Sequence, residues 1–310
     1  MKENCILCKS ENLKTLQKIK TSDINSLYLK DLGIDILEEY TYDDIIDYKK
    51  CLRCNLHFFS PQYTGSPQFY ESLLKPDDFY YKNNRYEFHA AKKFIKKKDK
   101  VLEIGAGVGH FSDIINVDDY IGLEYNDKAI QEAQKKGIKL IKKSIEEVAK
   151  ISENTYDVVC SFQVLEHVDN PNSYIESSLK VLKKGGLIIF GVPSAESFLT
   201  NNINHTLNFP PHHITRWYNK TFKYFEKIFN LELVSIENEP VSNRLRKRYI
   251  VDKFTTIFYR FFSFKKIIIS NSNRYIFFRK VIKKIITIFN INFSTKNEKG
   301  EAVIVILKKK

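Results

Sequence analysis

The sequence predicts an α/β fold: a mostly parallel sheet covered by helices on both faces, preceded by a small metal-binding module. Three observations support this prediction. Strand-like and helix-like segments alternate between residues 100 and 193, a pattern typical of parallel sheets. Four of the five cysteines form two C-x-x-C pairs near the N-terminus. A basic, aromatic stretch separates the last two strand-like segments, which predicts a helical insertion before the final strand.

The composition is that of a globular protein with one unusual segment. The 310 residues are 43% hydrophobic, and no run approaches the roughly 18 apolar residues of a membrane-spanning helix. The first residues, MKENCILCKS, lack the apolar run of a signal peptide, so we expect a cytoplasmic location. Residues 241–299 carry 15 Lys and Arg against two acids, a local excess equal to the net charge of +13 of the whole chain. The remainder of the chain therefore carries equal numbers of basic and acidic residues.

The two C-x-x-C pairs, Cys5–Cys8 and Cys51–Cys54, predict one structural zinc site. Each pair can present two thiolates from one tight turn, and two such turns complete a closed tetrahedral set without room for water. In a cytoplasmic chain this pattern favours metal over disulfides. A redox-active pair is the alternative. His57, three residues after Cys54, could replace a ligand, but we expect it on the surface.

The domain division follows from these patterns. We expect a zinc-ribbon-like module over residues 1–65, a helical connector over 66–98 and the α/β domain over 99–310, with the basic insertion at about 241–299. Cys160 lies in an apolar run, so we expect a small core residue there.

The elements of the α/β domain can be placed in order. Strands are predicted at 100–105, 120–125, 138–143, 156–163, 187–193, 232–236 and 301–307. A capped helix should close at Gly137, because glycine adopts the left-handed conformation that ends many helices. A second helix should begin at Asn172 and end at Gly185-Gly186, and a third should cover 218–229.

The glycine-rich turn after the first of these strands predicts a ligand site. Gly105, Gly107 and Gly109 let a ligand approach the backbone closely at a helix N-terminus. The dinucleotide spacing G-x-G-x-x-G fails because position 110 is His. Glu103, inside the strand, suits a ligand that carries a cation or an amino group better than it suits a pyrophosphate.

This turn, V-L-E-I-G-A-G-V-G at 101–109, resembles the first motif of class I S-adenosylmethionine-dependent methyltransferases. Glu124 ends the second strand, where that family places an acid bonded to the ribose hydroxyls. Residues 162–168, F-Q-V-L-E-H-V, resemble the stretch that lines the methionine side of the cofactor. The resemblance covers about residues 99–235, resumes at 301–307, and implies a Rossmann-like sheet of seven strands.

The resemblance also implies S-adenosylmethionine as cofactor and a set of residues that bind it. These are Glu103, Gly105, Ala106, Gly107, Gly109, Glu124, Tyr125, Ser144, Ile145, Phe162, Gln163 and His167. One position departs from the family pattern. The acid that often receives the adenine amino group is replaced by Ser144, so we expect Ser144, Ile145 and backbone groups to hold adenine.

The segment N-F-P-P-H-H-I-T-R-W, residues 208–217, is the candidate wall of the acceptor pocket. It follows the fifth strand, whose carboxyl end borders that pocket in this family, and its prolines limit backbone motion. His212 is the preferred candidate base, because an imidazole can take a proton near neutral pH; His213 and His167 are further candidates. A helix cap or a metal site is the alternative for the histidine pair, and Trp217 is expected to be a packing residue.

A zinc-ribbon-like module on this core, with P-P-H-H after the fifth strand, is similar to bacterial enzymes of sugar and surface-polysaccharide modification. The resemblance implies O-methylation of a sugar, a nucleotide sugar or a cell-surface glycan. Sugar C-methyltransferases are also similar, but they carry a further C-terminal domain, which we do not expect in this chain. A ribosomal RNA methyltransferase is the other alternative, although S-F-Q-V-L lacks an amine-methylation motif. A cofactor-binding scaffold without catalysis is a third.

The basic insertion suggests a partner. Its Lys and Arg alternate with Phe, Tyr and Ile at helical spacing, which is the composition of an amphipathic helix at a lipid surface. We therefore expect contact with anionic lipid on the inner membrane face, close to a lipid-linked glycan. A lid or a dimer interface is the alternative. Binding to nucleic acid is not expected, and the sequence does not predict an oligomeric state.

Overall fold

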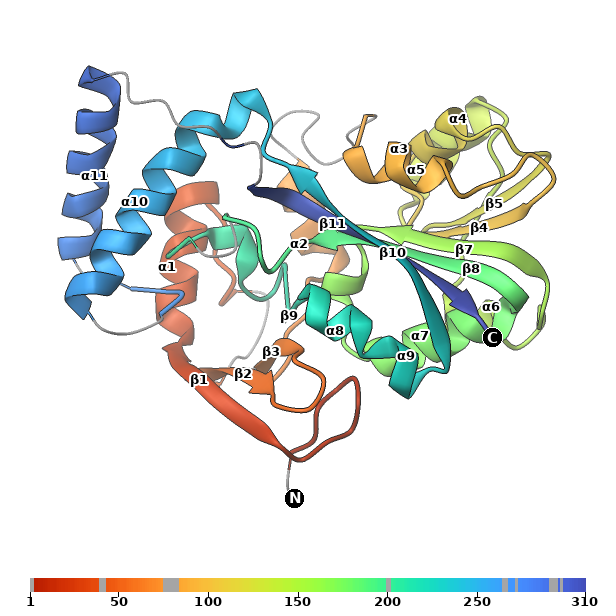
Figure 1. Ribbon diagram of the computed structural model, residues 1–310, viewed down its shortest axis with the longest axis horizontal. Helices are drawn as coiled ribbons and strands as arrows, with labels where there is room; N and C mark the ends of the chain where they lie inside the picture. The colour runs from red at the N-terminus through yellow and green to blue at the C-terminus, as the bar shows by residue number, and fades with distance from the viewer. Residues whose placement is uncertain are drawn as a thin grey trace.

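A computed structural model describes residues 3–38, 43–74, 84–198, 202–263, 267–270, 273–289, 295 and 298–310. Figure 1 shows three parts: a large sheet with helices on both faces, an N-terminal module beside one end of it, and a pair of long helices next to that module.

The large sheet has the seven strands that the sequence predicts. They are β4 (Lys100–Ile104), β5 (Asp119–Leu123), β6 (Leu140–Ile141), β7 (Tyr156–Phe162), β8 (Leu182–Pro193), β10 (Leu231–Pro240) and β11 (Lys299–Lys309). Their order is β10-β11-β8-β7-β4-β5-β6, and only β11 runs antiparallel to its neighbours. The carboxyl ends of β4, β5, β7 and β8 therefore meet at one edge. The predicted Rossmann-like methyltransferase fold is confirmed.

Helices cover both faces of this sheet (Figure 1). One side carries α3 (Tyr86–Lys92), α4 (His110–Ile114) and α5 (Asp127–Lys135), and the other carries α6 (Ile145–Val148), α7 (Pro171–Val181), α8 (Asn219–Lys223) and α9 (Phe225–Ile228). Phe88, Phe111 and Phe162 pack together in the core of the first side. Cys160 is fully buried there, as predicted.

Two helix boundaries differ from the prediction. Helix α7 includes Pro171, because proline fits the first helical position, where no backbone N–H is needed. The same helix ends at Val181, and Gly185 and Gly186 lie inside β8. A Cβ on Gly186 would lie 2.8 Å from the backbone oxygen of Asp157, so this glycine permits a close strand approach and does not cap the helix.

The connector is less helical than predicted in the residues described. It contains α2 (Pro67–Leu74) and α3, which is shorter than the helix expected to lead into the α/β domain. Residues 75–83 of the connector lie outside the described residues. Residues 218–229 form two short helices, α8 and α9, instead of one.

The N-terminal module is a four-stranded sheet that borrows a strand. Its own strands are β1 (Leu13–Lys20), β2 (Ile45–Cys51) and β3 (His57–Ser60), with helix α1 (Thr21–Leu32) between the first two. The fourth, β9 (Thr215–Arg216), comes from the P-P-H-H segment and pairs with β3. Cys5, Leu7 and Phe58 also share one hydrophobic core with Trp217 and Phe225. The module and the large sheet are thus packed as one body.

The insertion before β11 is helical, as predicted. It forms α10 (Arg246–Ser263) and α11 (Asn273–Ile288), which lie side by side in Figure 1. Buried Tyr249, Ile250 and Ile282 pack between them. Asp252 is 1% exposed and pairs with Arg279, whose Nη2 lies 3.2 Å from its carboxylate. Among the residues described, no helix has the length and apolar character needed to cross a bilayer.

Candidate functional site

The four cysteines of the module converge on one point. Cys5 Sγ lies 3.6 Å from Cys54 Sγ, and Cys8 Sγ lies 3.6 Å from Cys51 Sγ. All four ligand atoms lie within 4.8 Å of one another, and none of the cysteines forms a disulfide. A tetrahedral zinc ion with Zn–S bonds of about 2.3 Å sets its sulfurs about 3.8 Å apart.

The two knuckles have the same backbone geometry. Lys9 N donates to Cys5 O and Asn55 N donates to Cys51 O, at 2.9 and 3.0 Å. Lys9 and Asn55, the residues after each second cysteine, both adopt positive φ, 58° and 64°. This geometry and the all-thiolate donor set fit a structural zinc ion, which these cysteines would hold away from solvent. His57 is not a ligand and not on the surface: it is buried, and Tyr48 Oη lies 2.8 Å from its Nδ1.

The glycine turn lies at the carboxyl edge of the large sheet. Gly105, Gly107 and Gly109 have φ of 73°, 56° and 82°, a region that favours glycine. A Cβ on Gly105 would lie 2.4 Å from Val164 Cγ2, so only glycine fits against that side chain. Ala106, also predicted to bind the cofactor, is buried within the turn. The turn therefore keeps its backbone open to a ligand at the start of α4.

Glu124 bridges the turn and the end of β5. Its carboxylate accepts hydrogen bonds from the backbone N–H groups of Gly107, Tyr125 and Asn126 at 2.7–2.8 Å. A carboxylate offers about four acceptor sites, so about one remains for a ribose hydroxyl. Tyr125 itself is 60% exposed at the same edge. These residues fit the predicted cofactor.

Glu103 has a different environment from the one expected of a direct ligand. It is 2% exposed and accepts a hydrogen bond from the hydroxyl of Tyr120. Burial raises the pKa of Glu103 to about 8. The carboxyl therefore binds its proton tightly and lies beneath the glycine turn.

The remaining predicted cofactor residues lie along the same edge. Ser144 forms a capping box with Glu147 at the start of α6, and Ile145 is buried behind it. Phe162 ends β7 in the core, and Gln163 follows with φ of 57°. Gln163 Nε2 donates to Glu87 Oε1 at 2.7 Å, and Glu87 is itself buried. Their contact with the cofactor stays a prediction.

The histidine segment is held by four other parts of the chain. The hydrogen bonds that hold it are Tyr28 Oη to Phe209 O (2.8 Å), Phe59 N to Ile214 O (3.0 Å), Ile214 N to Glu166 O (3.0 Å) and Ala195 N to Trp217 O (2.9 Å). Helix α1 and β3 of the module, the turn after β7 and the end of β8 thus all contact it. Trp217 is fully buried and stacks on Phe222, as expected for a packing residue.

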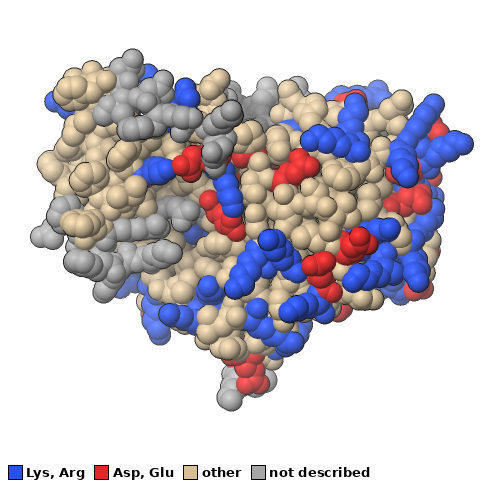
Figure 2. Space-filling model, viewed as in Figure 1, with Lys and Arg blue, Asp and Glu red and all other residues tan. Residues whose placement is uncertain are grey.

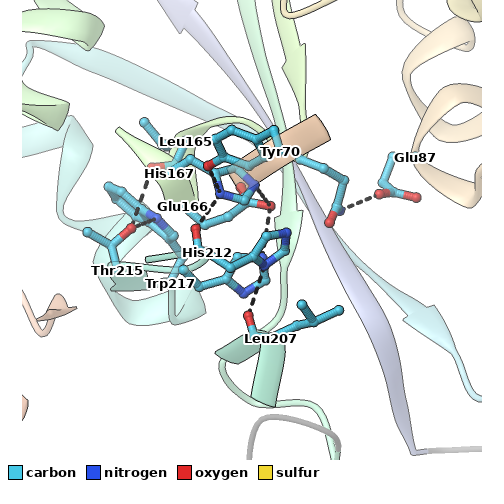
Figure 3. A network of polar contacts seen from close by, with 11 residues as sticks. Tyr70, Glu87, Leu165, Glu166, His167, Leu207, His212, Thr215 and Trp217 are labelled. Atoms are coloured by element: carbon cyan, nitrogen blue, oxygen red, sulfur yellow. Dashed lines mark hydrogen bonds and ion pairs between the residues drawn. The ribbon is translucent and has the colours of Figure 1, made fainter. Parts of the chain in front are cut away.

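The three candidate bases form one cluster. His167 lies on a short 3-10 helix, η1 (Leu165–His167), and its ring centroid is 4.8 Å from that of His212 and 5.0 Å from that of His213. His212 and His213 are stacked at 4.3 Å. Figure 3 shows His167 and His212 joined through the backbone oxygen of His212, with Tyr70 beside them.

Burial keeps these imidazoles neutral. It lowers the pKa of His167 to about 4 and that of His212 to about 3, and it holds the pKa of His213 well below its usual range. Neutral imidazoles have a free lone pair at pH 7. An imidazole with so low a pKa holds an abstracted proton weakly, however, and Brønsted behaviour then limits it as a general base. Catalysis by His212, His213 or His167 stays a prediction.

Sequence reasoning missed three residues of this site. Glu166 is 1% exposed, next to His167, and burial raises its pKa to about 8. Tyr70 Oη lies 3.1 Å from His167 Nδ1, and Glu87 supports Gln163. Only Glu166 had a signal in the sequence, because an acid inside the apolar stretch V-L-E-H-V requires a partner. Tyr70 and Glu87 come from the connector, whose approach to the site depends on the tertiary fold.

Known proteins resemble part of this chain. An uncharacterized protein of Methanocaldococcus jannaschii is 34% identical over 130 residues, which are 42% of this chain and 60% of that protein. A ubiquinone biosynthesis O-methyltransferase of Photobacterium profundum is 31% identical over 110 residues, 32% of this chain and 47% of that protein. The chain thus spans less than two thirds of the length of these relatives.

Solved structures are similar as well. A SAM-dependent methyltransferase from Archaeoglobus fulgidus has a TM-score of 0.48 and 19% identity, covering 72% of this chain and 91% of that chain. The family model described as a methyltransferase domain matches residues 79–236, just over half of this chain. The match includes the glycine turn, Glu124 and the histidine segment. The chain therefore belongs to the methyltransferase domain family.

Proposed function

We propose that this chain transfers a methyl group from S-adenosylmethionine to a hydroxyl group of a sugar, a nucleotide sugar or a cell-surface glycan. The observation that carries the proposal is a polar, histidine-lined wall that begins next to the glycine turn. Val164 packs against Gly105, and Glu166 and His167 follow within three residues. A donor bound at the turn would therefore have its methyl group near this wall.

The wall suits a hydroxyl-bearing acceptor. Tyr70 Oη, the imidazoles of His167 and His213 and the carboxyl of Glu166 offer both donors and acceptors within a short distance of one another. The side chains of His167 and His213 keep 16% and 12% of their surface exposed, so a small group can reach them. The relatives named ubiquinone biosynthesis O-methyltransferases support oxygen as the methylated atom.

Bound S-adenosylmethionine supplies an electrophilic methyl group on a sulfonium. The work of this chain is to position the reactants, since methyl transfer needs in-line, near-attack geometry. Gly105, Gly107 and Glu124 would hold the donor, and the segment 208–217, hydrogen-bonded to four other parts of the chain, would hold the acceptor. The hydroxyl proton would leave on the side of the histidine cluster.

A lipid surface is the proposed source of the acceptor. Phe277, Val281, Ile285 and Ile288 are all exposed on α11 at spacings that place them on one helix face. Lys280 and Lys284 flank this apolar stripe. Figure 2 shows few charged side chains over α10 and α11 on the face drawn, while Lys and Arg gather lower on the molecule. Such a surface suits the boundary of an anionic bilayer.

The similarity to ubiquinone biosynthesis enzymes favours a second candidate acceptor, a phenolic lipid. Both candidates are tested by one experiment. The protein is incubated with S-adenosylmethionine labelled in the methyl group and, separately, with a nucleotide-sugar panel, lipid-linked glycans, a phenolic lipid and ribosomal RNA. We expect label in an O-methyl signal of a sugar. Label only in the phenol or the RNA would overturn the glycan assignment, and no label with any acceptor would favour a non-catalytic scaffold.

A further inference from the structure

The strongest unexplained feature of the structure is a buried carboxyl group, that of Glu166, beside three imidazoles. Glu166 is 1% exposed, and no other residue described donates a hydrogen bond to either of its carboxylate oxygens. A buried carboxyl group without hydrogen-bond partners is unfavourable, and its charged form would require a nearby cation. His167 Nε2 and His213 Nε2 lie 3.7 and 3.9 Å from Glu166 Oε1, too far for hydrogen bonds.

The backbone fixes which nitrogen of two imidazoles carries the proton. His167 Nδ1 lies 2.5 Å from the backbone oxygen of His212, and His212 Nδ1 lies 3.0 Å from that of Leu207. A carbonyl oxygen can only accept, so both Nδ1 atoms are donors and both Nε2 atoms carry lone pairs. The lone pair of His167 Nε2 is therefore adjacent to a carboxylate oxygen (Figure 3).

This arrangement is what a cation requires. Metal-binding histidines commonly donate their second nitrogen to a backbone carbonyl, which orients the ring and fixes the tautomer. One ligand atom from each of His167, His212 and His213 lies within 4.8 Å of the other two. A cation among these nitrogens would also give Glu166 the partner that it lacks.

We propose that Glu166, His167, His212 and His213 form a second metal site, which binds one divalent transition-metal ion. Imidazole and carboxylate ligands together suit manganese, iron, cobalt, nickel or zinc. Four thiolates, by contrast, select zinc, whereas the second site would accept a wider range of ions. The partial exposure of His167 and His213 leaves one side open to an additional ligand.

The site would give the metal a role in the proposed O-methylation, and this role rests on that function. An acceptor hydroxyl bound to the ion has a lowered pKa, as metal-bound water does. Its O–H bond then breaks with the proton passing to water. The new O–C bond forms as the C–S bond breaks, and the electron pair stays on sulfur in S-adenosylhomocysteine. The imidazoles can be weakly basic in this mechanism, because they bind the metal ion and do not have to accept the proton.

Manganese binding tests the site without any activity. Mn²⁺ is titrated into the zinc-containing chain, and unbound Mn²⁺ is followed by electron paramagnetic resonance. We expect one Mn²⁺ per chain, with at least tenfold weaker binding in Glu166→Gln and in His213→Ala. His89→Ala is the matched control, because His89 is exposed on α3 and outside the cluster. Emission of Trp217 shows whether each variant keeps its fold.

Two results would overturn the metal site: no binding of Mn²⁺ to the wild-type chain, or equal binding by Glu166→Gln, His213→Ala and the wild type. Co²⁺ gives an independent check. We expect it to show weak d–d bands without thiolate charge transfer while zinc stays in the cysteine site; thiolate bands alone would contradict the proposal. Neither experiment contains donor or acceptor, so a metal site without glycan methylation would overturn only the acceptor assignment.

Discussion

His57 of β3 is paired with Arg216 of β9, so the strand that follows the second zinc knuckle lies directly beside the end of the histidine segment. Arg216 is 5% exposed, and its guanidinium lies 5.0 Å from the ring of Tyr48 and 5.5 Å from that of Phe59. Its Nη2 donates to Asn208 O at 2.9 Å. The module therefore forms part of the support of the candidate acceptor wall, and its integrity should matter at that wall.

Loss of zinc should disturb this wall first. Cys5 and Cys54 share a hydrophobic core with Trp217, the single tryptophan of the chain. Structural zinc contributes on the order of 10 kcal/mol in small modules. We expect Cys54→Ser, or removal of zinc by a chelator, to shift the emission of Trp217 to the red. Turnover should fall more than affinity for S-adenosylmethionine, which calorimetry measures.

Cys160→Ser is the matched control for that experiment, because it replaces a buried cysteine away from the cluster. It should leave the zinc content at one ion per chain. An unchanged emission spectrum in a zinc-free sample would show that the cysteine cluster does not support the wall.

Alanine substitutions at two glycines distinguish the effect of backbone strain from the effect of a steric clash. Gly105 and Gly137 have φ of 73° and 75°, so alanine at either position adopts a left-handed conformation that costs about 1–2 kcal/mol. Only at Gly105 would the new Cβ also meet a side chain, Val164; nothing lies within 4 Å at Gly137. We expect Gly105→Ala to weaken S-adenosylmethionine binding at least tenfold in calorimetry, and Gly137→Ala to leave it unchanged. Equal affinities of the two variants for S-adenosylmethionine would show that the glycine turn does not bind the cofactor.

The buried carboxyl of Glu103 should make stability depend on pH. Its folded pKa of about 8 lies above the value of about 4.3 in an unfolded chain. The folded state therefore holds this proton more tightly, and the resulting stability is complete below about pH 4 and lost as pH rises towards 8. Glu103→Gln should remove that dependence, flattening the free energy of unfolding by up to about 1.4 kcal/mol per pH unit between pH 5 and 8.

Urea unfolding at pH 5, 6, 7 and 8 measures this effect. Glu132→Gln, on the exposed face of α5, is the control and should run parallel to the wild type. Parallel curves for Glu103→Gln as well would mean that solvent reaches this carboxyl in the folded chain.

The sequence predicted most of the large sheet, because each strand is a short apolar run bounded by turn signals. It did not predict β9, because a strand of two residues has no periodicity of its own and exists only through pairing with β3. The unsatisfied state of Glu166 could not be predicted either. That state depends on the histidine segment returning to η1, as the hydrogen bond from Ile214 N to Glu166 O shows. The prediction that Gly185 and Gly186 end a helix was wrong, because both glycines lie inside strand β8.

The apolar stripe of α11 should bind anionic vesicles. Burial of Phe277 and Ile285 in the lipid boundary contributes about 25 cal/mol for each Å² of apolar surface removed from water, and Lys280 and Lys284 add attraction to the headgroups. We expect co-sedimentation with phosphatidylglycerol vesicles at low salt, reduced at least tenfold in the variant Phe277→Ser/Ile285→Ser. Ile151→Ser is the control, because Ile151 is 68% exposed outside the insertion. Equal loss of binding in both variants, or no binding by the wild type, would leave α10 and α11 without a role at the membrane.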